Sequence, residues 1–327
     1  MQRSVLGLDI GGANLKAAHT NGLACLHPFE LWKFPGQLPV AISDLLRIMP
    51  KSDFVAVTMT GELCDCFESK RQGVEAILDA VRLAADTTPI LVWTTTGSFK
   101  DSKDARVDYL RTAAANWLAL ATFAGRFVPS ETGLLIDLGS TTTDIVPLIN
   151  GRPVPRGITA PERLRCRELI YTGVRRTPVC ALLGGEGAAE FFATTLDVYL
   201  LLGEIPPDPN DRRTADGRPA TVQAAHARMA RMMCADSETC SVETAMKVAR
   251  ELYARQSTLL QDAVAQVSAR LPSSPTTAVI SGSGEFLARR LVCEAKTISL
   301  AEKLGPAISS AACAYAVAML AREFVDR

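Results

Sequence analysis

Short apolar runs separated by glycine turns open the chain. Residues 4–10 are mostly apolar, and after two consecutive glycines the apolar pattern resumes over residues 15–19. Asn21 and Gly22 follow, a dipeptide that favours a tight hairpin turn because both residues tolerate a positive φ. The pattern therefore predicts two strands, at 4–10 and 15–19, that lead into a further hairpin.

The same pattern returns in the middle of the chain. Residues 133–149 contain an apolar run, a turn and a second apolar run, and another Asn-Gly dipeptide follows. Asp137 follows Asp9 by the same 128 positions that separate Gly139 from Gly11. Agreement over strand, acid, glycine and hairpin predicts an internal duplication of the fold.

Helical and strand patterns alternate after each of these segments, as is typical of an α/β fold. The predicted helices are 38–49, 73–85, 105–123, 220–233, 242–271, 285–293 and 307–324, and the predicted strands are 54–59, 90–95 and 278–281. We expect two domains with a break near residues 125–131. The first would comprise residues 1–125 plus 306–327, and the second residues 126–305.

Composition narrows the class of protein. The 327 residues are 48% hydrophobic and 21% charged, and 35 basic residues balance 35 acidic ones. A disordered chain or a nucleic-acid binder held by bulk charge is therefore excluded. No apolar run approaches the roughly 20 residues that span a membrane, and the start of the chain does not resemble a signal peptide. We expect a cytoplasmic protein with no membrane partner; the sequence leaves homo-oligomerisation open.

The nine cysteines do not form a recognisable metal site. They contain no CxxC pair, and with three histidines in the chain there is no spacing that completes a tetrahedral zinc site. We expect reduced thiols that pack as small hydrophobic groups.

Three glycine turns stand at the ends of predicted strands, at residues 9–14 (DIGGAN), 137–144 (DLGSTTTD) and 281–285 (SGSGE). Such turns allow backbone N–H groups to approach phosphate oxygens. A carboxylate beside a phosphate requires a cation between them, so Asp9 and Asp137 are candidates for holding Mg²⁺. Alternatively, each glycine only permits a tight hairpin and each acid caps a turn. Three such turns together favour the phosphate-binding interpretation.

This set resembles the two phosphate motifs and the adenosine motif of the superfamily of acetate and sugar kinases, heat-shock chaperone ATPases and actin. More narrowly, the chain resembles stand-alone hydantoinase/oxoprolinase-like proteins of tetrahydromethanopterin-linked one-carbon metabolism, whose archaeal members are similar to the synthase of methanofuran biosynthesis. The resemblance covers nearly the whole length. It is carried by residues 8–16 (LDIGGANLK), 58–63 (TMTGEL), 136–147 (IDLGSTTTDIVP), 171–178 (YTGVRRTP) and 214–217 (TADG).

The resemblance implies a duplicated actin-like (ribonuclease H-like) two-domain fold with a cleft between the domains. It also implies a condensation, in which the phenol of a glutamyl tyramine or tyrosine displaces diphosphate from an aminomethyl-furan-methyl diphosphate. Asp9 and Asp137 would hold Mg²⁺ for this reaction, with Glu62 as the first candidate for the general base and Asp144 as the second. The phosphate contacts would come from Gly11, Gly12, Asn14, Lys16, Gly139, Ser140, Thr141 and Thr142.

Several of these positions have a plainer interpretation. Glu62 could be an exposed carboxylate in a turn, and Lys16 could extend into solvent. Arg175 and Arg176 could bind an anionic group such as the glutamyl carboxylate, or form a solvated basic turn. We interpret Trp117 as a core aromatic residue rather than a substrate contact.

An ATP-using enzyme is the rival class, either a small-molecule kinase or an amide hydrolase similar to the hydantoinases. Gly282 and Gly284 stand where an adenosine motif would lie, but Glu285 follows them directly. ATP as a cofactor is therefore left open.

The polar segment 206–219 carries four prolines and several turn-forming residues. We expect a loop that borders the cleft and closes on ligand, because loops of this length in compact domains are often lids.

Overall fold

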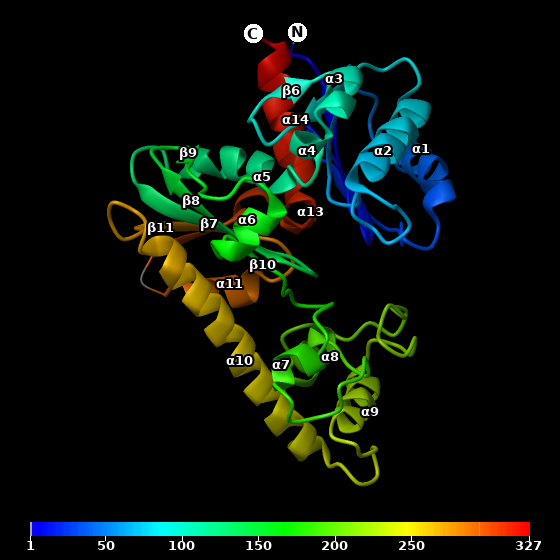
Figure 1. Cartoon of the computed structure of the whole chain (residues 1–327), viewed down its shortest axis with the longest axis vertical. Helices are drawn as coiled ribbons and strands as arrows, with labels where there is room; N and C mark the ends of the chain where they lie inside the picture. The colour runs from blue at the N-terminus through cyan, green and yellow to red at the C-terminus, as the bar shows by residue number, and fades with distance from the viewer. Residues whose placement is uncertain (1, 294) are drawn as a thin grey trace.

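The computed structural model describes residues 2–293 and 295–327. Two β-sheets lie side by side with helices between and around them, and a lobe of helices extends from the second sheet (Figure 1). The two chain ends lie together at the far end of the first sheet (Figure 1). Within the described residues, no helix is long and apolar enough to cross a membrane.

The first sheet has six strands in the order β3-β2-β1-β4-β5-β6. Its central strand β1 runs antiparallel to β2 and parallel to β4, and all its residues are buried. Burial on both faces explains why this strand is apolar throughout rather than alternating. The strands are β1 (Val5–Ile10), β2 (Asn14–His19), β3 (Ala24–Pro28), β4 (Phe54–Met59), β5 (Ile90–Trp93) and β6 (Phe99–Lys100).

The second sheet repeats this arrangement. Its main path is β10-β8-β7-β11-β12, with β9 paired to β8. The central strand β7 runs antiparallel to β8 and parallel to β11, as β1 does with β2 and β4. The strands are β7 (Thr132–Leu138), β8 (Thr143–Ile149), β9 (Arg152–Pro153), β10 (Leu169–Ile170), β11 (Thr277–Ser281) and β12 (Lys296–Ser299). The predicted duplication is confirmed.

The turns that follow the two central strands share one backbone design. The N–H of Gly11 donates to the carbonyl of Asn14 at 3.0 Å, and the N–H of Gly139 donates to that of Thr142 at 2.9 Å. These pairs are again 128 positions apart, so the duplication extends to the hydrogen bonds of each turn.

Helices cover both faces of each sheet. Between the sheets, α14 packs on β1 while α5 packs on β7 and β8, and the two helices contact each other. On the outer faces, α1 and α2 cover the first sheet, and α10 and α11 cover the second. These helices are α1 (Leu38–Ile48), α2 (Lys70–Ala85), α5 (Asn116–Ala124), α10 (Val242–Ser268), α11 (Glu285–Leu291) and α14 (Ala312–Val325).

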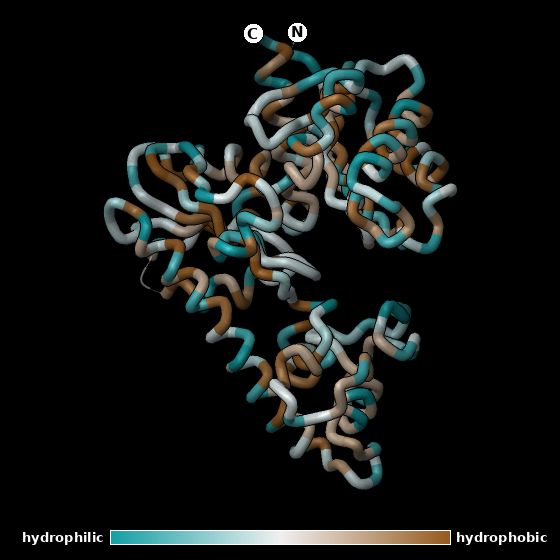
Figure 2. The backbone as a smooth tube through the Cα atoms, in the orientation of Figure 1, coloured by the Kyte–Doolittle hydropathy of each residue, from teal (hydrophilic) through white to brown (hydrophobic). Residues whose placement is uncertain are grey.

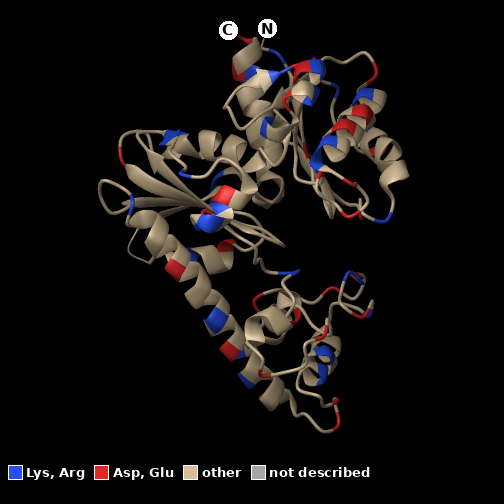
Figure 3. Ribbon diagram, viewed as in Figure 1, with Lys and Arg blue, Asp and Glu red and all other residues tan. Residues whose placement is uncertain are grey.

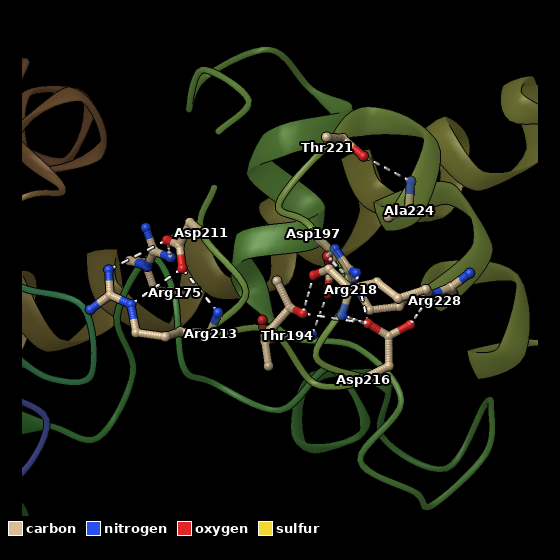
Figure 4. Close-up of polar contacts among 11 residues, drawn as sticks. Arg175, Thr194, Asp197, Asp211, Arg213, Asp216, Arg218, Thr221, Ala224 and Arg228 are labelled. Atoms are coloured by element: carbon tan, nitrogen blue, oxygen red, sulfur yellow. Dashed lines mark hydrogen bonds and ion pairs between the residues drawn. The ribbon is translucent and has the colours of Figure 1, made fainter. Parts of the chain in front are cut away.

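A third group of helices forms the lobe, which contains α7 (Cys180–Leu183), α8 (Thr195–Leu201), α9 (Val222–Met232) and the first half of α10. Inside it, the fully buried Arg228 guanidinium lies 2.7 Å from Asp197 and 2.9 Å from Asp216 (Figure 4). Because an unpaired buried charge is very costly, this network fixes residue 216 of the polar loop to α9.

Two predicted helices are interrupted. The prediction of one helix at 105–123 was wrong, because Ala113 is extended and Ala114 has a φ of 48°, which separates α4 from α5. The predicted helix 307–324 is broken at Ala311, which has a φ of −116°. The remaining helical segments are η1 (Pro35–Gln37), α3 (Ser102–Val107), α4 (Tyr109–Thr112), η2 (Gly125–Phe127), α6 (Ala160–Arg165), α12 (Leu300–Leu304) and α13 (Pro306–Ser310).

The distribution of polarity agrees with this layering. Hydrophobic positions gather in the strands and facing helices, whereas the loop at 206–219 is largely hydrophilic (Figure 2). Acidic and basic residues are interspersed along the chain (Figure 3). We propose the domain division into residues 1–125 plus 306–327 and residues 126–305, with α5 as the helix that contacts both parts.

The packing of α14 on β1 allows a test of this interface. A Cβ atom at Gly7 would lie 1.9 Å from the backbone oxygen of Ala314, so Gly7→Ala must displace the helix. We expect a loss of about 3 kcal/mol in the free energy of unfolding, measured by denaturant titration. Gly36→Ala is the control, since no atom lies within 4 Å of the added Cβ. Equal stability of the two variants would contradict this packing.

Candidate active site

A cavity of about 520 Å³ lies between the two halves, where the duplicated turns face each other. Both turns and the acids before them contribute to its lining. Of the residues predicted from the sequence, the cavity brings together Asp9, Gly11, Gly12, Asn14, Lys16, Glu62, Asp137, Gly139, Ser140, Thr141, Thr142 and Asp144. Residues 128 positions apart in the chain thus line one space.

Asp9 is the acid at the end of β1, and its side chain is almost fully buried. One carboxylate oxygen, Oδ1, is buried without a hydrogen-bond partner, and Oδ2 lies 3.7 Å from the Nζ atom of Lys16. Burial raises the pKa of Asp9, although Lys16 acts in the opposite direction. Burial also disfavours the charge on Lys16, but attraction to Asp9 and other acidic groups leaves the pKa of Lys16 above its ordinary value. Lys16 is therefore a cavity cation rather than a solvent-exposed one.

Asp137 occupies the equivalent position at the end of β7. The hydroxyl of Ser281 donates to its Oδ1 at 2.5 Å. Burial and repulsion from Asp144 raise the pKa of Asp137 to about 6, against the effect of the Ser281 hydrogen bond. On the other sheet, Thr58 pairs with Asp9 in the same register as Ser281 with Asp137. The sequence did not reveal this role of Ser281, because it depends on the pairing of two distant strands.

Glu62 follows β4 and is only 2% exposed, which excludes the solvated-turn interpretation. Its Oε2 atom is buried without a partner. Burial raises the pKa of Glu62 to about 7, and Asp9 adds to the shift while Lys70 and backbone N–H groups oppose it. The backbone of Glu62 is held by α2, since a Cβ at Gly73 would lie 2.1 Å from the Glu62 carbonyl oxygen. A carboxyl that titrates near neutrality in a cavity is suited to accept a proton.

Asp144 is engaged by a residue that the sequence analysis missed. The Nη1 atom of Arg163 donates to its Oδ1 at 2.7 Å, and Nη2 donates to the carbonyl of Glu168. The same guanidinium lies 3.8 Å from the centre of the Trp117 ring. Trp117 is buried as predicted, and it also lines the cavity. Because its partner is fixed in this way, Asp144 is less available as a base than Glu62.

The third glycine turn lies outside the cavity lining. Cβ atoms at Gly282 and Gly284 would lie 2.5 Å from the carbonyl oxygen and 2.2 Å from a side-chain carbon of Leu138, respectively. Gly282 also has a φ of 90°, a conformation that favours glycine. These glycines thus let β11 and α11 approach β7 closely, and a contact with adenosine stays a prediction.

Arg213 of the polar loop 206–219 reaches the first half of the chain. The Nη1 atom of Arg213 lies 3.4 Å from the Oδ1 atom of Asn14, which lines the cavity. Asp211 orients Arg213 and also accepts a hydrogen bond from Arg175 at 2.5 Å (Figure 4). The loop does not itself contribute to the cavity lining, and its closure on ligand stays a prediction.

Residues 53–324 match the hydantoinase/oxoprolinase family. The chain belongs to this family. It is 34% identical, over the whole of both chains, to the (4-{4-[2-(gamma-L-glutamylamino)ethyl]phenoxymethyl}furan-2-yl)methanamine synthase of Methanocaldococcus jannaschii. It is 30% identical over 201 residues to the protein of the same name from Methanococcus vannielii, covering 57% of this chain and 89% of that one.

A solved structure shares the fold of this family member. Nucleotide-free acetone carboxylase aligns with a TM-score of 0.57 at 10% identity, covering 97% of this chain and 70% of that one. Together with the repeated sheets, this confirms the predicted duplicated actin-like two-domain fold. Both family relatives are named as synthases, and therefore as enzymes.

The cavity of this family member has the chemistry that Mg²⁺ requires. Asp9 is a buried carboxylate with one oxygen that has no partner, and Asp137 is a partly exposed carboxylate at the equivalent position. Within the described part of the chain, no three acidic, histidine or cysteine side chains are close enough to hold a metal by themselves. Mg²⁺ is commonly bound through one or two carboxylates plus water and substrate phosphates, so the residues fit an ion completed by a phosphate ligand.

The raised pKa of Glu62 gives a pH test. Because the folded pKa is about 7 against 4.5 for the unfolded chain, the stabilisation present at low pH is lost as the pH rises through 7. We expect the free energy of unfolding of Glu62→Gln, relative to that of the unmodified protein, to increase by about 2 to 3 kcal/mol as the pH is raised from 5 to 8. Denaturant titration at each pH measures this difference. The exposed Glu68→Gln is the control. A constant difference for Glu62→Gln would contradict the burial of its carboxyl.

Proposed function

We propose that this chain catalyses the aryl ether condensation for which its full-length relative is named. The observation that carries the proposal is the 34% identity over the whole of both chains. The name of that relative describes a product in which a phenol oxygen is bonded to the methylene carbon of a furan. The cavity supports the proposal because it combines two glycine turns suited to phosphate with a buried carboxylate suited to accept a proton.

The substrates we propose are an aminomethyl-furan-methyl diphosphate and the phenol of a glutamyl tyramine or tyrosine. The phenol oxygen forms a bond to the methylene carbon of the furan. The bond between that carbon and the diphosphate oxygen breaks, and its electron pair leaves with the diphosphate. The phenolic proton passes to the carboxylate of Glu62, so charge and atoms balance. The products are the aryl ether, diphosphate and a proton.

The two turns would hold the leaving group. Backbone N–H groups of Gly12 and Ser140 and the hydroxyl of Thr141 can donate to phosphate oxygens from opposite sides of the cavity. Lys16 adds a positive charge. Mg²⁺ bound by Asp9 and Asp137 would neutralise charge that develops on the departing diphosphate. Glu62 would act as the base, since Asp144 is paired with Arg163.

Other parts of the assignment rest on the sequence. We propose a cytoplasmic enzyme with small-molecule substrates, because the charge is balanced and no apolar run is long enough for a membrane span. ATP use by a kinase or an amide hydrolase remains the alternative, and the location of Gly282 and Gly284 outside the cavity lining gives it no support.

The assay that tests the function supplies the furan diphosphate, γ-glutamyl tyramine and Mg²⁺. We expect the ether by mass spectrometry and one diphosphate released for each ether formed. Incubations without acceptor and with ATP replacing the diphosphate substrate are the controls. Absence of ether, together with ATP hydrolysis or phosphate transfer to a small acceptor, would replace the condensation with the ATP-using alternative.

Substitution of two carboxylates should separate base from metal ligand. We expect Glu62→Gln to lower kcat by roughly 10²- to 10⁴-fold while the affinity for diphosphate is kept. Asp137→Asn should reduce turnover and weaken the dependence on Mg²⁺, because a neutral amide does not offset the cation. Steady-state rates across a Mg²⁺ titration measure both effects, with Glu68→Gln as control. Full activity of Glu62→Gln would move the role of base to Asp144.

A further inference from the structure

Four cationic side chains line the cavity, and they differ in how they are neutralised. Lys16 lies beside Asp9, and Arg163 is paired with Asp144. Within residues 2–293 and 295–327, Lys70 and Arg176 make no ion pair with an acidic side chain. Lys70 is close enough to Glu62 to lower the pKa of that carboxyl, so it belongs to the end of the cavity near the base. Arg176 lies beside the second glycine turn.

The backbone of Arg176 is attached to the second glycine turn. The N–H groups of Arg175 and Arg176 donate to the carbonyl of Ser140 at 3.1 and 2.9 Å. This close approach depends on Gly173, because a Cβ there would lie 2.5 Å from the carbonyl oxygen of Gly139. The position of Arg176 is thus fixed relative to the turn that we assign to phosphate.

The side chain of Arg176 extends toward the first glycine turn. Its guanidinium lies 4.9 Å from the centre of the Trp32 ring. Trp32 is next to Leu31, whose N–H donates to the carbonyl of Gly12 at 2.9 Å. Arg176 therefore connects the two turns across the cavity, from a backbone held by one turn to an indole held beside the other.

A second neighbour supports this location. The Sγ atom of Cys64 lies 2.7 Å from where a Cβ of Gly12 would be. Burial raises the pKa of the Cys64 thiol to about 11, and the positive charge of Arg176 opposes that shift. The charge of Arg176 thus acts on a group in contact with the first turn.

In the described part of the chain, the guanidinium of Arg175, unlike that of Arg176, is paired with an acidic side chain. Its guanidinium is held by Asp211, which also binds Arg213 of the polar loop (Figure 4). Of the two adjacent arginines, only Arg176 lines the cavity. The pair is therefore divided between a structural role for Arg175 and a ligand-binding role for Arg176.

We propose that Arg176 binds the departing diphosphate at the two turns, and that it does not bind the carboxylate of the acceptor. This rests on the proposed function for the identity of the leaving group. A guanidinium presents two parallel N–H donors that match phosphate oxygens, and stacking on Trp32 orients that plane before the ligand arrives. The glutamyl carboxylate, which the sequence allowed as an alternative ligand, lies at the far end of the acceptor from the reacting oxygen.

The test uses inorganic diphosphate with Mg²⁺ as the probe, titrated by calorimetry into the full-length protein. We expect Arg176→Gln to raise the Kd roughly 10- to 100-fold, as is usual for the loss of a charged hydrogen-bond pair, and Arg176→Lys to raise it less. The KM for the phenolic acceptor should not change. Arg152→Gln, an exposed arginine outside the cavity, is the matched control.

Each outcome distinguishes the two proposals. An unchanged Kd for diphosphate, or a raised KM for the acceptor alone, overturns the assignment of Arg176. Tight diphosphate binding that depends on Arg176, without any ether formed, supports Arg176 and overturns the proposed condensation. If the variants fail to fold, modification of the unaltered protein with phenylglyoxal decides the question. Protection of Arg176 by diphosphate and Mg²⁺ is expected, and equal modification with and without the ligand would refute it.

Discussion

The close contact between α14 and β1 determines the geometry on which the rest of the molecule depends. The buried face of α14 consists of alanines, Cys313 and Val317, and Gly7 lets the helix backbone come against the strand. Small residues on this face bring α14 and α5 together, and these helices in turn hold the two sheets at a fixed separation. Since each glycine turn is an extension of a central strand, that separation also sets the width of the cavity.

Within the cavity, the removal of carboxylates from water has an electrostatic cost in folding free energy. Asp9, Asp137 and Glu62 are withdrawn from water, and burial is the first cause of the raised pKa of each. A site that keeps several desolvated carboxylates together is more stable when cations occupy it. Negative charge that destabilises the folded protein favours the binding of a metal together with an anionic ligand. The same residues therefore affect both stability and recognition.

Features that repeat along the chain, or that follow from an alternation of helix and strand patterns, could be predicted from the sequence. The duplicated strands, their turns and the acidic residues at the ends of the central strands followed from the 128-residue offset and from the resemblance to a known superfamily. Features that arise from contacts between distant segments were not accessible in this way. Arg163 carries no local motif, and the break at Ala114 depends on tertiary packing that overrides helix propensity. The lobe and the pairing of Ser281 with Asp137 required the folded chain.

The two turns have the same backbone but different side chains, and this difference has a consequence for orientation. Free diphosphate has two equivalent ends, and a site made of two equivalent turns would accept it either way round. Here Gly12 and Ala13 on one side correspond to Ser140 and Thr141 on the other, so hydroxyl donors are present at one turn only. After duplication, divergence within the turns gave the two sides of the cavity different hydrogen-bond donors. A diphosphate ester, which carries a carbon on one end, can therefore bind in one orientation in preference to the reverse.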